Sequence, residues 1–156
     1  MTFRSLCVIA AMLFLAACQT SPQSGANAGG TAAATAAAPG SREDFVQNVG
    51  DRVFFDFDKS NIKPEGEQTL QRQAAWLKKY SSVKVTVEGH CDDRGTREYN
   101  LALGARRANA VKRALVALGI DANRITTISY GKERPAVIGD NEAAWAQNRR
   151  GVTVVQ

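Results

Sequence analysis

The chain has 156 residues and a formal net charge of +5, with acidic and basic residues interleaved. Because it contains no block of lysines and arginines and no ladder of aromatic residues, the sequence does not favour a nucleic-acid-binding protein. All charged residues except Arg4 lie from Arg42 onward. We therefore expect one charged globular domain, at 42–156, preceded by uncharged segments.

The first residues have the layout of a bacterial lipoprotein signal peptide. Arg4 precedes an apolar run, Leu6–Leu15, which is too short to span a bilayer because a spanning helix takes about 20 residues. Small residues then lead to Cys18, in an order that resembles the lipobox. We expect residues 1–17 to be removed and Cys18 to be acylated, with each buried methylene contributing about 0.8 kcal/mol to the anchor. An ordinary signal peptide followed by a chance cysteine is the alternative.

The residues after Cys18 predict a tether and a location. In lipoproteins of this kind, Asp after the cysteine is associated with the inner membrane. Here the residue is Gln19, so the resemblance implies the outer membrane, with the domain in the periplasm. Residues 18–41 are uncharged and low in complexity, and they cannot bury enough apolar surface to fold. We expect them to form the lipidated end and a flexible linker.

Residues 42–156 show the patterns of an α/β domain. Strands are predicted from β-branched and aromatic runs, at 53–57, 83–87, 125–130 and 152–155. Helices are predicted from Pro64 to the Ser81-Ser82 break, from about Glu98 to Leu118, and from an N-cap at Asp140 through Asn148. The alternating order predicts a two-layer sandwich, with a mixed four-stranded sheet and helices on one face.

The longest predicted helix carries a candidate binding face. Its core stripe follows steps of three and four residues, with Leu101, Ala105, Ala108, Val111, Leu115 and Leu118. Gly119 should end the helix as a left-handed cap. Asn100 and Arg107 are two turns apart on a face that flanks this stripe, and Gly104 between them is expected to clear space for a ligand.

Four segments resemble the OmpA-like domain family: FFDFDKSNI (54–62), VEGHCDDRGTREYNLALGARRANAVKRAL (87–115), SYGKERPAV (129–137) and EAAWAQNRR (142–150). Together with the lipobox, the last two are most similar to the peptidoglycan-associated lipoproteins of that family. The sequence departs from the usual pattern at two places. Cys91 stands where Thr or Ala is usual, and Asp140-Asn141 stands where His-Asp is usual.

The resemblance implies non-covalent binding of the peptidoglycan stem peptide at diaminopimelate, without metal or cofactor. It also implies partnership with a TolB-like periplasmic protein, and a role in envelope integrity and cell division. Carried over by position, Asp92 and Arg107 grip the ligand, and the residues that line the site are Asp58, Arg94, Asn100 and Arg150.

The chemistry of the ligand agrees with this assignment. The free end of diaminopimelate is an ammonium beside a carboxylate, so its recognition needs an acid and a base close together. Arg is the side chain best suited to bind a carboxylate, because its guanidinium holds donors in a fixed geometry that can bind both oxygens at once. The simpler alternative is that Asp92 and Arg107 pair with each other, since surface ion pairs are common and contribute little.

An enzyme is the main competing class of protein, because His90-Cys91-Asp92 looks like a hydrolase constellation. In an extended segment adjacent side chains point to opposite faces, so we do not expect His90 and Cys91 to share a proton. His90 is the only histidine, so no second base exists and a zinc site would have at most one imidazole. We expect His90 to be a hydrogen-bonded structural residue at a strand end. A lipoprotein that binds other proteins but no cell wall is a third class.

Overall fold

The structure is a computed structural model and describes residues 37–156. The signal peptide predicted at 1–17, the lipidation residue Cys18 and most of the predicted linker lie outside these residues. Within the described range, no helix has both the length and the apolar character needed to cross a membrane.

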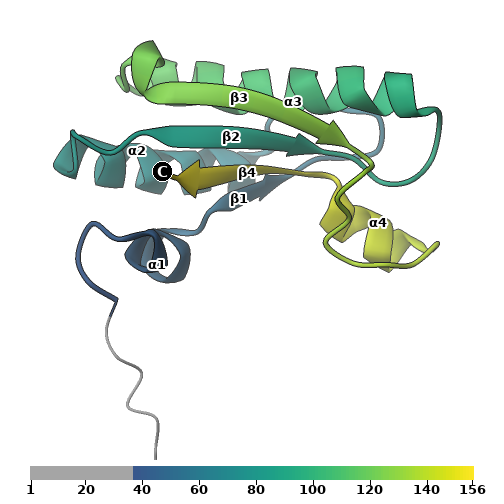
Figure 1. Ribbon diagram of the computed structural model, residues 1–156, viewed down its shortest axis with the longest axis horizontal. Coiled ribbons are helices and arrows are strands. Elements are labelled where there is room, and N and C mark those ends of the chain that lie inside the picture. The colour runs from purple at the N-terminus through teal and green to yellow at the C-terminus, as the bar shows by residue number, and fades with distance from the viewer. Residues whose placement is uncertain (1–36) are drawn as a thin grey trace, which may run out of the picture. The chain divides into compact units, whose positions relative to one another are not determined.

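Four strands form one mixed sheet (Figure 1). The strands are β1 (Arg52–Phe54), β2 (Val85–His90), β3 (Ile125–Gly131) and β4 (Arg150–Val155). Their order across the sheet is β1-β4-β2-β3. β2 and β3 are parallel, whereas β4 is antiparallel to both of its neighbours. All four predicted strands are present, with shifted ends.

Two long helices, α2 (Pro64–Lys79) and α3 (Arg97–Ala117), lie on one face of the sheet (Figure 1). The short helix α4 (Glu142–Asn148) lies beyond the end of the sheet at which β2 and β3 finish and β4 starts. A 3-10 turn, η2 (Ala122–Arg124), leads into β3. The predicted two-layer α/β sandwich is therefore confirmed. The N-cap of α4 is Asn141, whose side chain accepts from the Ala144 amide, and the prediction of Asp140 as the cap is wrong by one residue.

Two short helical elements precede the sheet and were not predicted. They are α1 (Arg42–Asp44) and a π-helical turn, η1 (Phe45–Val49). Contacts with α2 hold both elements in place. Asp44 accepts a hydrogen bond from the indole of Trp76 at 2.8 Å. The fully buried Phe45 ring packs edge-on against the same indole. Their eight residues are too few to show helical periodicity, so the sequence pattern alone did not indicate them.

The two strands nearest the candidate site differ in length from the prediction. β1 stops at Phe54 because its partner β4 begins at Arg150, directly opposite. One further bond joins the amide of Phe55 to the carbonyl of Arg149. β2 instead runs on to His90, because β3 and β4 pair with it on both sides beyond Val87. The chain after β1 is therefore a loop where a strand was expected.

α3 approaches the sheet so closely that two glycines are required. A Cβ atom on Gly89 would lie 1.8 Å from the Gly104 carbonyl oxygen, and one on Gly104 would lie 2.3 Å from the hydroxyl of Ser129. Gly104 thus makes room for the sheet, and the expectation that it clears space for a ligand is wrong. Gly119, with φ at +90°, has the predicted left-handed conformation after the helix.

The buried face of α3 is displaced from the predicted stripe. Ala108, Val111 and Leu115 are buried as expected, but Leu101, Ala105 and Leu118 are only partly buried. Asn100, Leu103 and Arg107 are buried in their place. The prediction failed because it placed only apolar residues inside, whereas here the polar groups of Asn100 and Arg107 are satisfied by carbonyl oxygens of neighbouring loops.

Candidate ligand-binding site

An open pocket of about 180 Å³ lies where the loops after β1 and β2 meet the first turns of α3. Its lining residues are Phe57, Asp58, Asp92, Arg94, Gly95, Tyr99, Asn100 and Leu103. Four of the six predicted site residues are in this set. A larger hollow, of about 300 Å³, lies between β1 and the start of α2, but it contains none of the predicted site residues.

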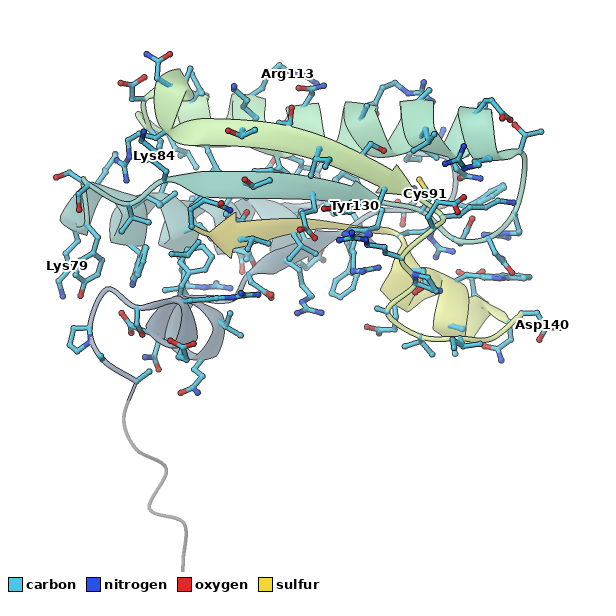
Figure 2. All side chains as sticks on the ribbon, viewed as in Figure 1. Lys79, Lys84, Cys91, Arg113, Tyr130 and Asp140 are labelled. Atoms are coloured by element: carbon cyan, nitrogen blue, oxygen red, sulfur yellow. The ribbon has the colours of Figure 1, made fainter. Side chains whose placement is uncertain are left out.

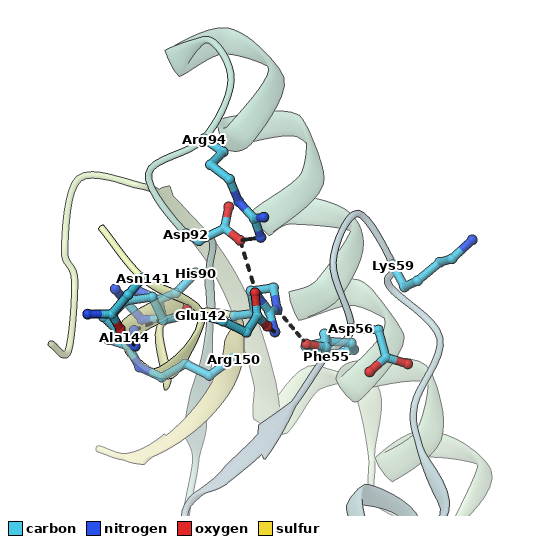
Figure 3. A network of polar contacts seen from close by, with 12 residues as sticks. Phe55, Asp56, Lys59, His90, Asp92, Arg94, Asn141, Glu142, Ala144 and Arg150 are labelled. Carbon is cyan, nitrogen blue, oxygen red and sulfur yellow. Dashed lines mark hydrogen bonds and ion pairs between the residues drawn. The ribbon is translucent and has the colours of Figure 1, made fainter. Parts of the chain in front are cut away.

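Asp92 supplies the buried acid of the pocket. Its carboxylate accepts hydrogen bonds from Arg94 at 2.5 Å and from Arg149 at 3.3 Å (Figure 3). Only 4% of the residue is exposed. Among the ion pairs of the described residues, Asp92 appears with these two arginines and not with Arg107. The alternative of a simple Asp92–Arg107 pair is therefore not what the structure contains.

Arg94 is the base at the mouth of the pocket. Its guanidinium carbon lies 3.9 Å from the ring centre of Phe57 and 4.0 Å from that of Trp145, so two aromatic rings stack against it. Its side chain keeps 31% exposure. Its Nε is buried and has no hydrogen-bond partner among the described residues. The stacking holds the plane of the guanidinium, and the exposed part of the group can meet an incoming carboxylate.

Arg107 is fully buried and does not present the free fork that was expected. Its guanidinium donates to the carbonyls of Lys59 at 2.8 Å, His90 at 2.8 Å and Asp56 at 3.0 Å. Burial lowers the pKa of this guanidinium. Arg107 thus joins the loop after β1 to the end of β2 and forms the floor behind the pocket. Its direct contact with a ligand stays a prediction.

Asn100 and Asp58 both line the pocket, in different ways. Asn100 is buried, and its amide group donates to the carbonyls of Arg94 at 2.8 Å and Thr96 at 3.0 Å. Asp58 lies at the exposed rim and accepts a hydrogen bond from the Tyr99 hydroxyl, which raises the pKa of Tyr99. With φ at +57°, Asp58 is the single non-glycine residue of the described range with positive φ, a conformation that Asp tolerates.

Arg150 does not line the pocket, and its direct contact with a ligand stays a prediction. Its guanidinium donates to the carbonyls of Asn148 and Arg134, and Figure 3 shows it turned away from Asp92. The preceding residue, Arg149, contacts Asp92 and also bonds Glu142 at 2.5 Å. Adjacent side chains at the start of a strand point to opposite sides. Which of Arg149 and Arg150 faces Asp92 depends on the residue at which β4 begins, and β4 begins at Arg150.

Trp145, Phe57 and Tyr99 were also missed, because aromatic residues outside the core have no periodic signal of their own. A clue was available, since all three lie inside the segments that resemble the family. Phe57 is 54% exposed and Tyr99 is 45% exposed. They make much of the accessible lining of the pocket apolar.

His90 and Cys91 do not form a catalytic pair. His90 is buried at the end of β2, and its Nε2 lies 3.2 Å from Glu88, as expected for a structural residue. Burial, aided by the charge of Arg150, lowers the pKa of His90 to about 4. The Cys91 thiol donates instead to the Asn100 carbonyl, and burial raises its pKa. Among the described residues no group of His, Cys, Asp and Glu could hold a metal.

Comparison with known proteins places the chain in a family. The model of the OmpA family matches residues 54–149. The peptidoglycan-associated lipoprotein of Agrobacterium fabrum is 52% identical over 145 residues, covering 92% of this chain and 82% of that protein. The crystal structure of the peptidoglycan-associated lipoprotein of Burkholderia pseudomallei matches with a TM-score of 0.70 and 40% identity, over 74% of this chain and 100% of that one. The C-terminal domain of Helicobacter pylori MotB shares the fold, with a TM-score of 0.63 and 24% identity over 68% of this chain and 84% of that one. The chain therefore belongs to the OmpA family.

Proposed function

We propose that the chain is an outer-membrane lipoprotein that binds peptidoglycan non-covalently, through the free end of diaminopimelate in the stem peptide, and so holds the membrane to the cell wall. The names of its relatives support association with peptidoglycan. The observation that carries the proposal is the placement of a buried carboxylate, that of Asp92, against a partly exposed guanidinium, that of Arg94, in one open pocket.

In the proposed complex each charge of the ligand meets an opposite charge. The ammonium binds Asp92, with Asp58 at the rim as a second acceptor. The carboxylate binds Arg94, whose plane is already fixed by Phe57 and Trp145. Arg107 places a second positive charge behind the pocket. It has five N–H donors, three of which hold carbonyls, so its main task is to shape the wall.

Binding rather than catalysis is the activity of this pocket. Cys91 has no base beside it, and the chain's relatives belong to a family of wall-associated proteins that is not an enzyme family. The competing proposal is a lipoprotein that contacts only other proteins. It would leave the Asp92–Arg94 arrangement without a ligand.

A second part of the proposal is a protein partner, a TolB-like periplasmic protein acting in envelope integrity and cell division. The support is the likeness to the peptidoglycan-associated lipoproteins and the exposed apolar residues Phe57 and Tyr99 around the pocket. A partner seated on this rim would cover the pocket. Peptidoglycan fragments and the partner should then compete for the full-length chain in a binding assay, and independent binding of both would count against a shared surface.

Sedimentation with bare peptidoglycan tests the wall-binding proposal. The full-length chain in detergent should pellet with purified sacculi, and a soluble peptide that contains diaminopimelate should release it. The same peptide with lysine in place of diaminopimelate lacks the side-chain carboxylate and should release it poorly. A chain that stays in the supernatant would favour the protein-only alternative. The anchor is tested separately, because Cys18→Ser should leave an unprocessed or soluble form.

A further inference from the structure

The loop that carries Asp92 and Arg94 is held by side chains from both sides. The Lys132 ammonium donates to the carbonyl of Asp93 at 3.0 Å and to that of Gly95 at 2.7 Å. The side-chain amide of Asn100 donates to the carbonyls of Arg94 and Thr96, which alternate along the chain with those that Lys132 binds. Four consecutive carbonyls are thus bound by two residues, one that follows β3 and one on α3.

This loop has no strand neighbour to fix it. Its backbone is tied to the sheet at its start, where the amide of Cys91 donates to the Gly131 carbonyl at 2.8 Å. Gly95 has φ at +86°, in the left-handed region, and glycine can also adopt other turns because it has no Cβ atom. The bonds from Lys132 are charge-assisted, so they are the strongest of those that set the direction of the peptide groups around Asp93.

Lys132 is itself placed rigidly. It follows Gly131, where a Cβ atom would lie 2.9 Å from the Leu101 amide nitrogen, so this point of the chain is pressed against the start of α3. The backbone from which the Lys132 side chain extends toward the loop is therefore closely packed. Lys132 does not line the pocket that contains Asp92, so any effect it has on a ligand passes through the loop.

We propose that Lys132 is a positioning residue for the peptidoglycan site, acting by fixing the carbonyls of Asp93 and Gly95 so that Asp92 and Arg94 face the pocket. The inference rests on the proposed function. Asp93 lies between the acid and the base of the site, and a rotation of its peptide group would move both. A preset loop binds more tightly because the ligand does not have to order it.

The test is a titration of the full-length chain with a stem tripeptide that contains diaminopimelate. Lys132→Met keeps an unbranched side chain of nearly the same length but removes its charge and its donors, and it should weaken binding by about tenfold or more. Lys132→Arg should recover part of the affinity. Lys84→Met is the matched control, because Lys84 is exposed at the opposite end of the molecule from Cys91 (Figure 2), and it should bind as the wild type does.

Two further measurements separate positioning from general damage. In an Asp92→Asn background, Lys132→Met should cost much less affinity than in the wild type, because it acts through Asp92. NMR relaxation of the backbone amides in the free protein should show increased motion at Asp93 to Gly95 and no change in the sheet. Equal losses in both backgrounds, wild-type affinity of Lys132→Met, or unchanged loop motion would each overturn the inference. If the wild type does not bind the tripeptide, the proposed function fails, while the relaxation of the loop still decides whether Lys132 holds it.

Discussion

The Asp92 carboxylate accepts a hydrogen bond of 2.5 Å from Arg94, and both residues belong to the loop that follows β2. The acid and the base that a zwitterion needs are therefore paired in the free protein, where Asp92 also contacts Arg149. In the proposed complex the ligand's ammonium replaces the guanidinium at Asp92, and the released guanidinium meets the ligand's carboxylate. Binding then exchanges one ion pair for two, with no uncompensated charge left in the pocket.

Arg107 should contribute mainly to stability. Arg107→Lys replaces a planar group with five donors by one ammonium that cannot reach three separate carbonyls. We expect the free energy of unfolding to fall by roughly 2 kcal/mol or more, because buried carbonyls lose their partners. Chemical denaturation measures this, with the exposed neighbour Arg106→Lys as control. A variant of unchanged stability that no longer binds peptidoglycan would show instead that Arg107 touches the ligand.

Phe57 should act on binding through Arg94. Phe57→Ala removes one of the two rings that stack on the guanidinium, and such a contact contributes about 0.5–2 kcal/mol. Titration with the stem tripeptide should show a corresponding loss of affinity. Phe54→Ala is the control, because Phe54 is also exposed but lies on β1 outside the pocket. Equal affinities of the Phe57 and Phe54 variants would rule out this role.

Acid should weaken the fold through His90. Its pKa is about 4 in the folded chain and about 6.5 when exposed, so the unfolded chain takes up a proton first as the pH falls. Stability from this group is fully present above pH 6.5 and declines towards pH 4, by about 1.4 kcal/mol for each pH unit in between. His90→Gln should flatten the profile. The chain has one histidine, so NMR can follow it directly, and titration near pH 6.5 would contradict the account.

Cys91 should be dispensable for binding. Its thiol is buried and bonds only a backbone carbonyl, with no base beside it. Cys91→Ala is therefore expected to pellet with peptidoglycan as the wild type does, in a sedimentation assay run beside a folding control by circular dichroism. A folded Cys91→Ala protein that fails to bind would mean that the thiol shapes the loop more than its contacts indicate.

The architecture could be predicted because it depends on patterns that repeat. Alternating valines predicted β2, and the steps of three and four residues predicted α3. Strand ends were harder, since they depend on partners far away in the sequence, as β1 shows by stopping where β4 begins. α1 and η1 escaped prediction because one indole and one buried ring hold them.

The candidate site could be predicted in composition more than in geometry. The family resemblance indicated Asp58, Asp92, Arg94 and Asn100 as site residues, and all four line one pocket. The resemblance did not indicate that the guanidinium of Arg107 would donate to backbone carbonyls. Burial of a cation depends on where the loops place their carbonyl oxygens. Nor did the resemblance indicate that Arg149 would contact Asp92, because that contact depends on where β4 begins.

The most direct test of the account is a double-mutant cycle between Arg94 and the ligand's carboxylate. The full-length wild type and Arg94→Ala are each titrated with the diaminopimelate tripeptide and with the same peptide amidated at the side-chain carboxylate. Truncating one partner of such a pair typically costs about 2–5 kcal/mol. The account predicts that the wild type loses this much on amidation and that Arg94→Ala loses almost nothing more. Losses that simply add, or equal binding of both peptides by the wild type, would contradict the claim that this pocket reads the free end of diaminopimelate.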